Sequence, residues 1–416
     1  MKQTVLFILS CISVTALAQQ TSVLFVGNSY IYTQDLPGTL ANLATNGGHS
    51  IYHESSTPGG YTLEGHSTNA TTLNKIASRD WDFVVLQEQS QKPSFPPAQV
   101  AAETYPYAEI LVDSIKSNHE CTEPIFFMTW GRRDGDQQNC QFYAPLCTFE
   151  GMNARLRESY LEMGSDNSAT VAPCGAAWHQ MSLVNNPFWS GLYSGDGSHP
   201  SAWGTYLNAC VFYATIFRES PVGITYYSSI GQTDAEVLQQ LAEDIVLDST
   251  SSWFIGHQDV LADPEGTLNG AYEVIFTANS QNATDHYWDF GDGQTSTDEN
   301  PTHVYLVDDT FSVTHIASSN CGADTTYFDV TVEALSIGGS NEFDQVKLIR
   351  NGSSIAIQNP TTAAFNLEVL DATGRLTHSM ELQANSSLEI GSGLEIGLNF
   401  LRLSNRQSQT TIKLVK

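Results

Sequence analysis

The fold can be worked out from one short segment, Ser22-Val23-Leu24-Phe25-Val26-Gly27-Asn28-Ser29, and from what surrounds it. Its apolar run ends in glycine, which is typical of a strand buried on both faces of a parallel sheet. Leu36, Leu40 and Leu43 follow at helical spacing, so a helix over residues 36–46 is predicted next. The chain thus begins with a strand, a turn and a helix.

The same alternation continues up to about residue 255. Further strands are predicted at residues 50–54, 82–86 and 125–129, and helices at 103–117, 151–163, 201–218 and 233–248. Strands that alternate with helices favour a parallel sheet covered on both faces. We therefore expect residues 19–255 to form an α/β domain, a flavodoxin-like three-layer α/β/α fold.

The pattern changes near Gly256, where short runs rich in Thr, Val and Tyr with frequent turns predict a small β-sandwich over residues 256–334. Its most distinctive part is Tyr287-Trp288-Asp289-Phe290-Gly291-Asp292-Gly293, followed by Asn300-Pro301-Thr302-His303-Val304-Tyr305. This stretch resembles a PKD-type domain, an immunoglobulin-like module of many secreted bacterial enzymes. The resemblance implies a spacer or a weak binding module.

A second small β-sandwich is predicted over residues 335–416, from alternating apolar residues with turns about every dozen positions. Leu367-Glu368-Val369-Leu370-Asp371-Ala372-Thr373-Gly374-Arg375 and the terminal Lys413-Leu414-Val415-Lys416 carry this pattern. The tail resembles the C-terminal sorting domain of the type IX secretion system, although only Asn359-Pro360 stands where a Pro-Asn-Pro motif is usual. The resemblance implies the secretion machinery as a partner.

The N-terminus and the charge balance bear on location and partners. A basic start, an apolar stretch and Ala16-Leu17-Ala18 before Gln19 predict a signal peptide over residues 1–18. The 416 residues include 45 acidic and 17 basic ones, a formal net charge of −28, which argues against nucleic-acid and anionic-membrane partners. We expect a secreted or cell-surface protein without membrane insertion.

Six cysteines remain after the signal peptide, and export permits disulfides between them. Cys140 and Cys147 flank a short loop, which favours a local bridge between them. The other pairings stay open, and no cysteine or histidine group has the spacing of a zinc site.

Two motifs carry the candidate chemistry. Ser29 follows the first strand directly, where a nucleophile would be exposed at the carboxyl end of the sheet, although a Gly-Asn-Ser tripeptide is also a common loop. Asp196 precedes His199 by three residues, so one tight loop can bring a carboxylate to an imidazole. Alternatively, Asp196 is a turn residue and Ser201 is the N-cap of the next helix.

Together these motifs resemble the SGNH hydrolases, also called GDSL esterases, over residues 21–230. The resemblance implies that Ser29 is the nucleophile, that His199 is the general base and then acid, and that Asp196 orients the imidazole. It also implies oxyanion donors at the backbone N–H groups of Ser29 and Gly60.

After the third predicted strand, this chain departs from the Gly-x-Asn-Asp motif that is usual in the family. Here Leu86 is followed by Gln87-Glu88-Gln89-Ser90, and a glutamine amide can donate the same hydrogen bond to an oxyanion. Gln87 is our choice for this donor and Gln89 the substitute, because strand alternation cannot fix which one faces the pocket. The departure points to a divergent subgroup.

Trp130 and Arg132 follow the fourth predicted strand, at the edge where α/β sites form. Both are candidates for substrate binding, and Trp130 is equally suited to packing. The expected activity is hydrolysis of ester bonds without metal or cofactor, with removal of acetyl or other small acyl groups from extracellular carbohydrate as the preferred reaction. A lipid or aryl esterase and a non-catalytic glycan-binding surface protein are the alternatives.

Overall fold

The computed structural model describes residues 20–184, 188–269, 272–332, 335–336, 345–351, 354–370, 375–390, 398–405 and 409–415. The predicted signal peptide lies outside these residues. Residues up to Gln258 form one compact unit, and the residues from Asp259 onward form another.

The first unit is built on a five-stranded parallel sheet with the strand order β2-β1-β3-β4-β5. Its strands are β1 (Thr21–Val26), β2 (Ile51–Ser56), β3 (Phe83–Leu86), β4 (Glu123–Phe127) and β5 (Thr170–Ala172). The side chains of Val23, Leu24, Phe25 and Val26 are fully buried, as predicted for a strand covered on both faces. The chain reverses its direction of travel across the sheet between β1 and β3, which is the switch point where ligands bind in open α/β sheets.

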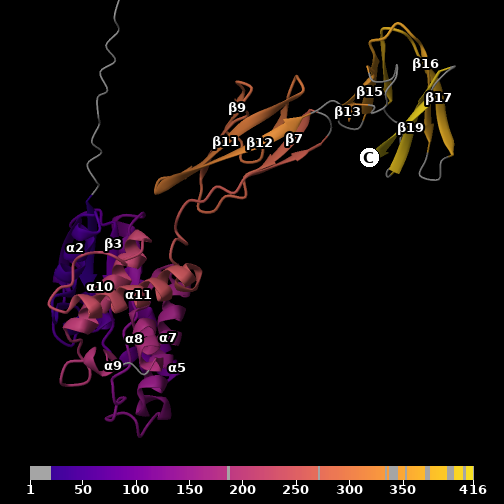
Figure 1. Ribbon diagram of the computed structural model, residues 1–416. Coiled ribbons are helices and arrows are strands. Elements are labelled where there is room, and N and C mark those ends of the chain that lie inside the picture. Colours follow the sequence, from indigo (N-terminus) through magenta and orange to yellow (C-terminus); the bar gives the residue numbers. More distant parts are fainter. Residues whose placement is uncertain are drawn as a thin grey trace, which may run out of the picture. The chain divides into compact units, whose positions relative to one another are not determined.

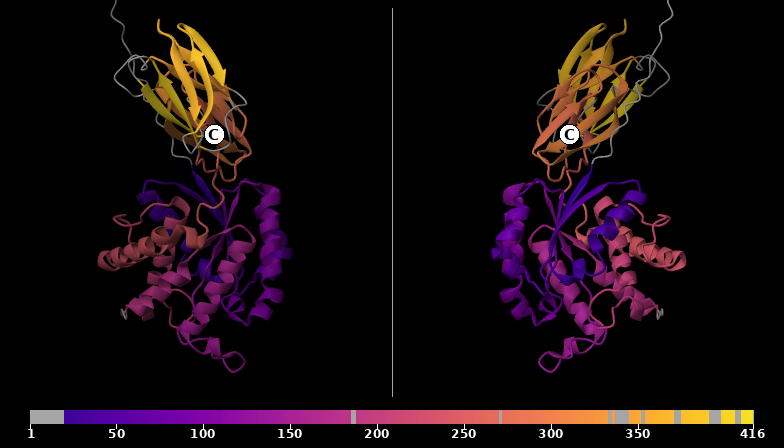
Figure 2. Two further views of the ribbon diagram at one scale, coloured as in Figure 1. Left: turned by 90° about the vertical axis from the view of Figure 1, so that its right-hand side faces the viewer. Right: turned by 90° about the vertical axis from the view of Figure 1, so that its left-hand side faces the viewer.

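Helices cover both faces of the sheet (Figures 1 and 2). Right-handed crossovers carry the β1–β2 connection over one face and the three later connections over the other. The first face holds α2 (Leu36–Asn46), with α10 (Ala202–Phe217) packed on it and α11 (Gln232–Val246) packed on α10. The second face holds α3 (Leu63–Thr68), α4 (Ala70–Ile76), α5 (Pro97–Glu103), α6 (Tyr105–Asn118) and α7 (Phe149–Asp166). The predicted three-layer α/β/α fold is confirmed.

Short helices complete this unit. They are α1 (Ser29–Tyr32), α8 (Cys174–Leu183), α9 (Phe188–Gly191), and the 3₁₀ turns η1 (Lys92–Ser94), η2 (Ala144–Cys147) and η3 (Leu247–Trp253). The helix predicted at residues 103–117 differs from the observed elements, because the chain leaves helical geometry at Thr104 and starts anew at Tyr105. Pro106 lacks an N–H group, so it suits the first turn of α6 but not the middle of a longer helix.

Residues 259–332 form two antiparallel sheets, with the orders β10-β7-β6 and β12-β11-β8-β9. Their strands are β6 (Glu265–Leu268), β7 (Glu273–Thr277), β8 (Asp285–Asp289), β9 (Thr295–Ser296), β10 (Thr302–Val304), β11 (Asp309–Ser319) and β12 (Gly322–Val332). Trp288 and Phe290 lie in a hydrophobic core of their own with Val274, Phe276 and Val313. The predicted small β-sandwich is therefore present.

The described residues from 335 onward form two further antiparallel sheets, ordered β13-β14-β15-β18 and β17-β16-β19-β20. Their strands are β13 (Leu335–Ser336), β14 (Lys347–Asn351), β15 (Ser354–Asn359), β16 (Phe365–Leu370), β17 (Leu376–Leu382), β18 (Ser386–Ile390), β19 (Leu398–Ser404) and β20 (Gln409–Val415). They enclose a separate core around Leu348, Leu367 and Leu401. Residues 371–374 of the 367–375 motif and Lys416 of the terminal motif lie outside the described residues.

Within the described part of the chain, no helix has the length and apolar character needed to cross a membrane.

Candidate active site

The turn after β1 places Ser29 at the carboxyl edge of the sheet. Gly27 has no room for a side chain, since a Cβ atom there would lie 2.5 Å from Gln87 Oε1 and 2.6 Å from Ile31 Cδ1. Asn28 caps α1, because its side-chain oxygen accepts from the Tyr30 N–H at 3.2 Å. Its amide donates to the Tyr61 carbonyl at 2.8 Å. Ser29 is thus the first residue of α1 and is held from both sides.

The structure brings together the three residues predicted to form a triad. Ser29 Oγ lies 2.8 Å from His199 Nε2, although the two residues are 170 positions apart in the sequence. His199 Nδ1 lies 2.5 Å from Asp196 Oδ2. This line of hydroxyl, imidazole and carboxylate is the arrangement in which a histidine can take a serine proton.

The loop that carries Asp196 and His199 is fixed by its own backbone. The Ser194 N–H donates to the His199 carbonyl at 2.8 Å, and Gly197 adopts a φ of +67°, a left-handed conformation that favours glycine. Asp196 Oδ1 accepts the N–H groups of Ser198 and His199, both at 3.0 Å. Burial opposes ionisation of Asp196, but its bonds with His199 and these N–H groups lower the pKa of its carboxyl overall. Asp196 is therefore both the turn residue and the partner of the imidazole.

Ser201, which follows the loop, caps the next helix, as the alternative interpretation of this segment predicts. Ser201 is the N-cap of α10, and its hydroxyl accepts the N–H groups of Trp203 and Gly204. The loop therefore leads directly into α10, which starts three residues after His199. The capping and the triad interpretations are thus compatible in one segment.

A stack of aromatic rings joins the Ser29 turn to the His199 loop. Tyr30 stacks on Trp130 with ring centroids 5.0 Å apart, and Trp130 stacks on Trp178 at 3.8 Å. The Tyr30 hydroxyl lies 2.6 Å from Ser198 Oγ, and the Trp130 indole N–H donates to the Ser198 carbonyl at 3.1 Å. These contacts connect the neighbours of both reacting side chains.

Trp130 itself does not reach the surface, since its exposed fraction is 0%. The prediction that it binds substrate is therefore wrong, because both faces of its ring are covered, one by Tyr30 and the other by Trp178. Its packing alternative holds. Sequence reasoning missed the stack because its three rings come from α1, the segment after β4, and α8, and meet only in the folded chain.

The two glutamine candidates for the oxyanion site have other partners. Gln87 is fully buried, its Oε1 accepts the Asn28 N–H at 2.9 Å, and its Nε2 donates to the Glu88 carbonyl. Gln89 Nε2 donates to Gln91 Oε1 at 3.1 Å. The described contacts make Gln87 a buried support for the turn below Ser29. They engage one N–H of the Gln89 amide, and the role of Gln89 as the substitute oxyanion donor stays a prediction. Side-chain direction after β3 is set by these tertiary contacts, which strand alternation does not contain.

Gly60 lies in an exposed turn after β2 and has a φ of +67°, with no atom within 4 Å of where a Cβ would be. The following residue, Tyr61, carries the carbonyl that accepts the Asn28 amide at 2.8 Å. The Gly60 turn is therefore tied to the turn that carries Ser29. Its role as an oxyanion donor stays a prediction.

Glu88 is a buried acid that sequence reasoning did not single out. Its carboxylate accepts the N–H of Gln89 at 2.5 Å and that of Leu63, at the start of α3, at 3.2 Å. Burial raises the pKa of Glu88 to about 7, against the lowering effects of these N–H groups and of Lys92. Glu88 thus links the loop after β3 to the segment that follows Gly60. A lone acid between two glutamines gave no signal in the sequence.

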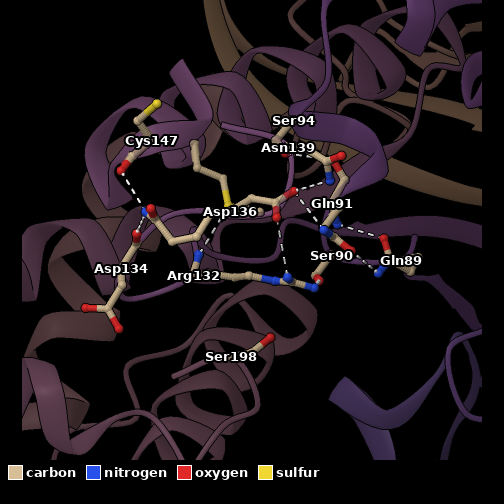
Figure 3. A network of polar contacts seen from close by, with 12 residues as sticks. Gln89, Ser90, Gln91, Ser94, Arg132, Asp134, Asp136, Asn139, Cys147 and Ser198 are labelled. Carbon is tan, nitrogen blue, oxygen red and sulfur yellow. Dashed lines mark hydrogen bonds and ion pairs between the residues drawn. The ribbon is translucent and has the colours of Figure 1, made fainter. Parts of the chain in front are cut away.

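Arg132 extends from the segment after β4 into a network of polar side chains (Figure 3). Its Nη1 lies 3.7 Å from Asp136 Oδ1, and its Nη2 lies 3.5 Å from Ser90 Oγ. Asp136 is fully buried, and its other oxygen accepts the amides of Gln91 and Asn139, both at 2.7 Å. The Arg132 side chain keeps an exposed fraction of 26%, so it remains accessible to a ligand.

Cys140 and Cys147 form the predicted disulfide, which closes the loop that precedes α7. Cys174 and Cys210 are free and buried.

Comparisons with known proteins agree with this organisation. Residues 262–333 match the family model described as the PKD domain, which confirms that resemblance. A search of curated proteins found no match to the chain.

Several solved structures are similar to the first unit. A DUF4886 family protein from Bacteroides uniformis is 16% identical, with a TM-score of 0.47, over 55% of this chain and 95% of that one. A protein from Slackia heliotrinireducens, provisionally assigned as an SGNH hydrolase, is 26% identical, with a TM-score of 0.38, over 47% of this chain and 98% of that one. The acetyl xylan esterase AlAXEase is 13% identical, with a TM-score of 0.38, over 47% of this chain and 99% of that one. Function is therefore inferred from the geometry of the site.

Proposed function

We propose that this chain is a serine hydrolase of ester bonds, with Ser29 as its nucleophile. The observation that carries this proposal is the hydrogen-bonded line from Ser29 Oγ to His199 Nε2 at 2.8 Å and from His199 Nδ1 to Asp196 Oδ2 at 2.5 Å. A serine hydroxyl is a weak nucleophile unless an adjacent base removes its proton. The location at the switch point between β1 and β3 also supports a ligand site.

The chemistry is acyl transfer to water. His199 Nε2 takes the Ser29 proton as Oγ attacks the ester carbonyl, and Asp196 stabilises the imidazolium that forms. The tetrahedral intermediate expels the alcohol, which takes the proton from His199, and an acyl group remains on Ser29. Water then attacks this acyl-enzyme with His199 again as base, and the acid leaves with Ser29 restored. These steps need no metal or cofactor.

The developing oxyanion requires preorganised donors, and two backbone N–H groups are proposed for it. Ser29 supplies the first from the start of α1, and Gly60 the second from the turn that Asn28 holds through Tyr61. Gln87 contributes indirectly, because it accepts the Asn28 N–H and thereby fixes the Ser29 turn.

The proposed substrates are acetyl or other small acyl esters of extracellular carbohydrate. Supporting this are the signal-peptide pattern of residues 1–18, the PKD domain and the acidic composition, which together suit an exported enzyme that acts on polysaccharide. The resemblance of residues 335–416 to a type IX sorting domain supports release to the cell surface or the medium through that machinery.

Hydrolysis assays test this proposal. We expect release of acetate from acetylated xylan or pectin and hydrolysis of 4-nitrophenyl acetate, with kcat lowered about 10⁴-fold or more in Ser29→Ala. Ser182→Ala, which changes a serine on α8 away from the triad, is the matched control and should keep full activity.

The same assays separate the alternatives. A preference for long-chain nitrophenyl esters would make the chain a lipid esterase. Binding of glycan with equal, background hydrolysis in the unmodified chain and in Ser29→Ala would make it a non-catalytic binding protein.

A further inference from the structure

We propose that Arg132 recognises a carboxylate on the substrate, so that the preferred ester is carried by an acidic sugar such as a uronic acid. This inference rests on the proposed ester hydrolase and names the class of its alcohol portion. It assigns Arg132 a role in specificity and leaves the chemical step to Ser29, His199 and Asp196.

Arg132 lies beside residues that flank both reacting side chains. The backbone N–H of the next residue, Arg133, donates to the Gly197 carbonyl at 2.9 Å, in the loop that carries His199. In the same loop, Ser198 Oγ lies 2.6 Å from the Tyr30 hydroxyl. Tyr30 follows Ser29 and Ser198 precedes His199. Figure 3 shows the Arg132 guanidinium close to Ser90 and Asp136, with Ser198 on the neighbouring loop. A substrate group next to the scissile ester can therefore reach this cation.

The guanidinium has donors to spare. An arginine carries five N–H donors in a planar fork. The described polar contacts of its two Nη groups are the long ones to Asp136 and Ser90, at 3.7 and 3.5 Å, and the side chain is 26% exposed. Its Nε is buried without a hydrogen-bond partner among the described residues, so the ligand contact falls to the Nη groups. Such a half-satisfied cation gains most from a ligand that accepts two charge-assisted bonds at once, as a carboxylate does.

Asp136, the carboxylate that orients Arg132, is itself held in place. Asp136 is fully buried and is held by the amides of Gln91 and Asn139, so the carboxylate that orients Arg132 cannot swing away with it. A positioned fork loses little conformational entropy when a ligand binds. Asp136 thus presents Arg132 to the ligand and leaves most of its donors unused.

The neighbouring arginine, Arg133, already has a carboxylate partner. The Arg133 guanidinium pairs with Asp134 at 3.1 Å, in an exposed pair. The whole chain, at a net charge of −28, repels anionic polymers at long range. Selective binding of an acidic sugar therefore requires a short-range contact, and Arg132 is placed to make it.

The test compares two substrates that differ in one group. Mono-O-acetylated methyl galacturonide carries a carboxylate where the corresponding galactoside carries a hydroxymethyl group. They are assayed with the full chain, with Arg132→Gln and with Arg132→Lys, and 4-nitrophenyl acetate serves as a neutral reference. Arg133→Gln is the matched control, because it removes the same charge one residue away.

We expect the unmodified chain to prefer the galacturonide. Arg132→Gln should raise KM for that substrate about 10- to 100-fold, the loss of a charge-assisted bidentate contact, and change kcat/KM for the two neutral esters less than about threefold. Arg132→Lys should recover part of the loss, and Arg133→Gln should lose far less. An equal loss on charged and neutral esters, or no preference in the unmodified chain, would overturn the inference.

Inhibition keeps the inference testable if Arg132→Gln does not fold. Free galacturonate should inhibit hydrolysis of 4-nitrophenyl acetate by the unmodified chain at least tenfold more strongly than galactose does, and equal inhibition contradicts the role of Arg132. If 4-nitrophenyl acetate is hydrolysed equally by the chain and by Ser29→Ala, the proposed function itself fails. Ser29-dependent hydrolysis without discrimination between the sugars removes only the carboxylate contact.

Discussion

At the scale of single residues, the triad was predictable because each half of it is local. Ser29 follows a strand that is visible in the sequence, and Asp196 and His199 share one tight loop. Their meeting across 170 positions follows once both segments reach the same edge of a sheet. Asp196 has two roles in this geometry, since one oxygen holds the loop N–H groups and the other holds the imidazole.

Asp196→Asn tests the second of these roles. An amide at this position keeps much of the loop geometry but no longer stabilises an imidazolium, so we expect kcat for ester hydrolysis to fall by about 10⁴-fold. The lowered pKa of Asp196 keeps it ionised in neutral and mildly acidic solution, and it should not add an acid limb to the pH profile. Asp134→Asn, which removes an exposed charge nearby, is the control. Near-normal turnover of Asp196→Asn would remove the carboxylate from the mechanism.

The residues that sequence reasoning misplaced are those whose surroundings come from distant segments. Gln87 faces the Asn28 backbone, and Trp130 is enclosed by Tyr30 and Trp178. The residue type indicated what each side chain can do, but the partner that it meets is determined only by tertiary packing. A donor in the sequence can therefore become a structural support in the fold.

At the scale of elements, continuous apolar strands and the longer helices were predictable. The strand at residues 82–86 and the helix at 201–218 correspond to β3 (Phe83–Leu86) and α10 (Ala202–Phe217) within one residue at each end. The short strand β5 (Thr170–Ala172) and helix α8 (Cys174–Leu183) were missed. Three residues carry too little periodicity to indicate a strand, and the ten residues of α8 are too few to show a distinct apolar face.

Glu88 connects two of these elements, the end of β3 and the start of α3. The titration of its carboxyl should make the free energy of unfolding depend on pH. Its pKa of about 7 lies above the ordinary value of 4.5, so the folded state prefers the protonated acid. The favourable contribution is complete below pH 4.5 and is lost as the pH rises to 7, a change of roughly 3 kcal/mol in the free energy of unfolding.

Glu88→Gln removes this titration. Urea unfolding at pH 5 and pH 8 should show the unmodified chain losing more stability at the higher pH than Glu88→Gln does. Glu109→Gln is the control, because it makes the same change at an exposed acid on α6. Equal pH dependence of the unmodified chain and Glu88→Gln would show that Glu88 has an ordinary pKa.

At the scale of the whole molecule, the described residues form three separate hydrophobic cores, one for the α/β unit and two for the β-sheets that follow. All of the residues proposed for catalysis belong to the α/β unit. The change in composition near Gly256 indicated this organisation, because helical periodicity gives way to short strands with frequent turns. Separate cores can respond differently to the same solution conditions.

Acid should therefore change the stability of the PKD domain and of the α/β unit in different directions. His315 is fully buried against Trp288, and burial, with His286 nearby, lowers the pKa of its imidazole to about 4. The folded domain thus favours neutral His315, and this contribution is present above pH 6.5 and is lost as the pH falls towards 4. Glu88 acts with the opposite sign in the α/β unit.

Calorimetry at pH 7.5 and pH 5 measures this difference. The transition of the PKD domain should move to lower temperature in acid, and His315→Phe, which keeps a ring against Trp288, should move less. His378→Phe, at an exposed position of β17, is the control. A PKD transition that is unaffected by pH would contradict a depressed imidazole pKa.

Labelling of the active serine tests the central claim most directly. A fluorophosphonate probe reacts with a serine hydroxyl only where a base activates it, and mass spectrometry locates the label. We expect labelling of Ser29 in the full chain, its loss in Ser29→Ala, and a strong reduction in His199→Ala. A chain that is left unlabelled, or one that is labelled at another residue while Ser29 stays unmodified, would contradict the assignment of Ser29 as an activated nucleophile.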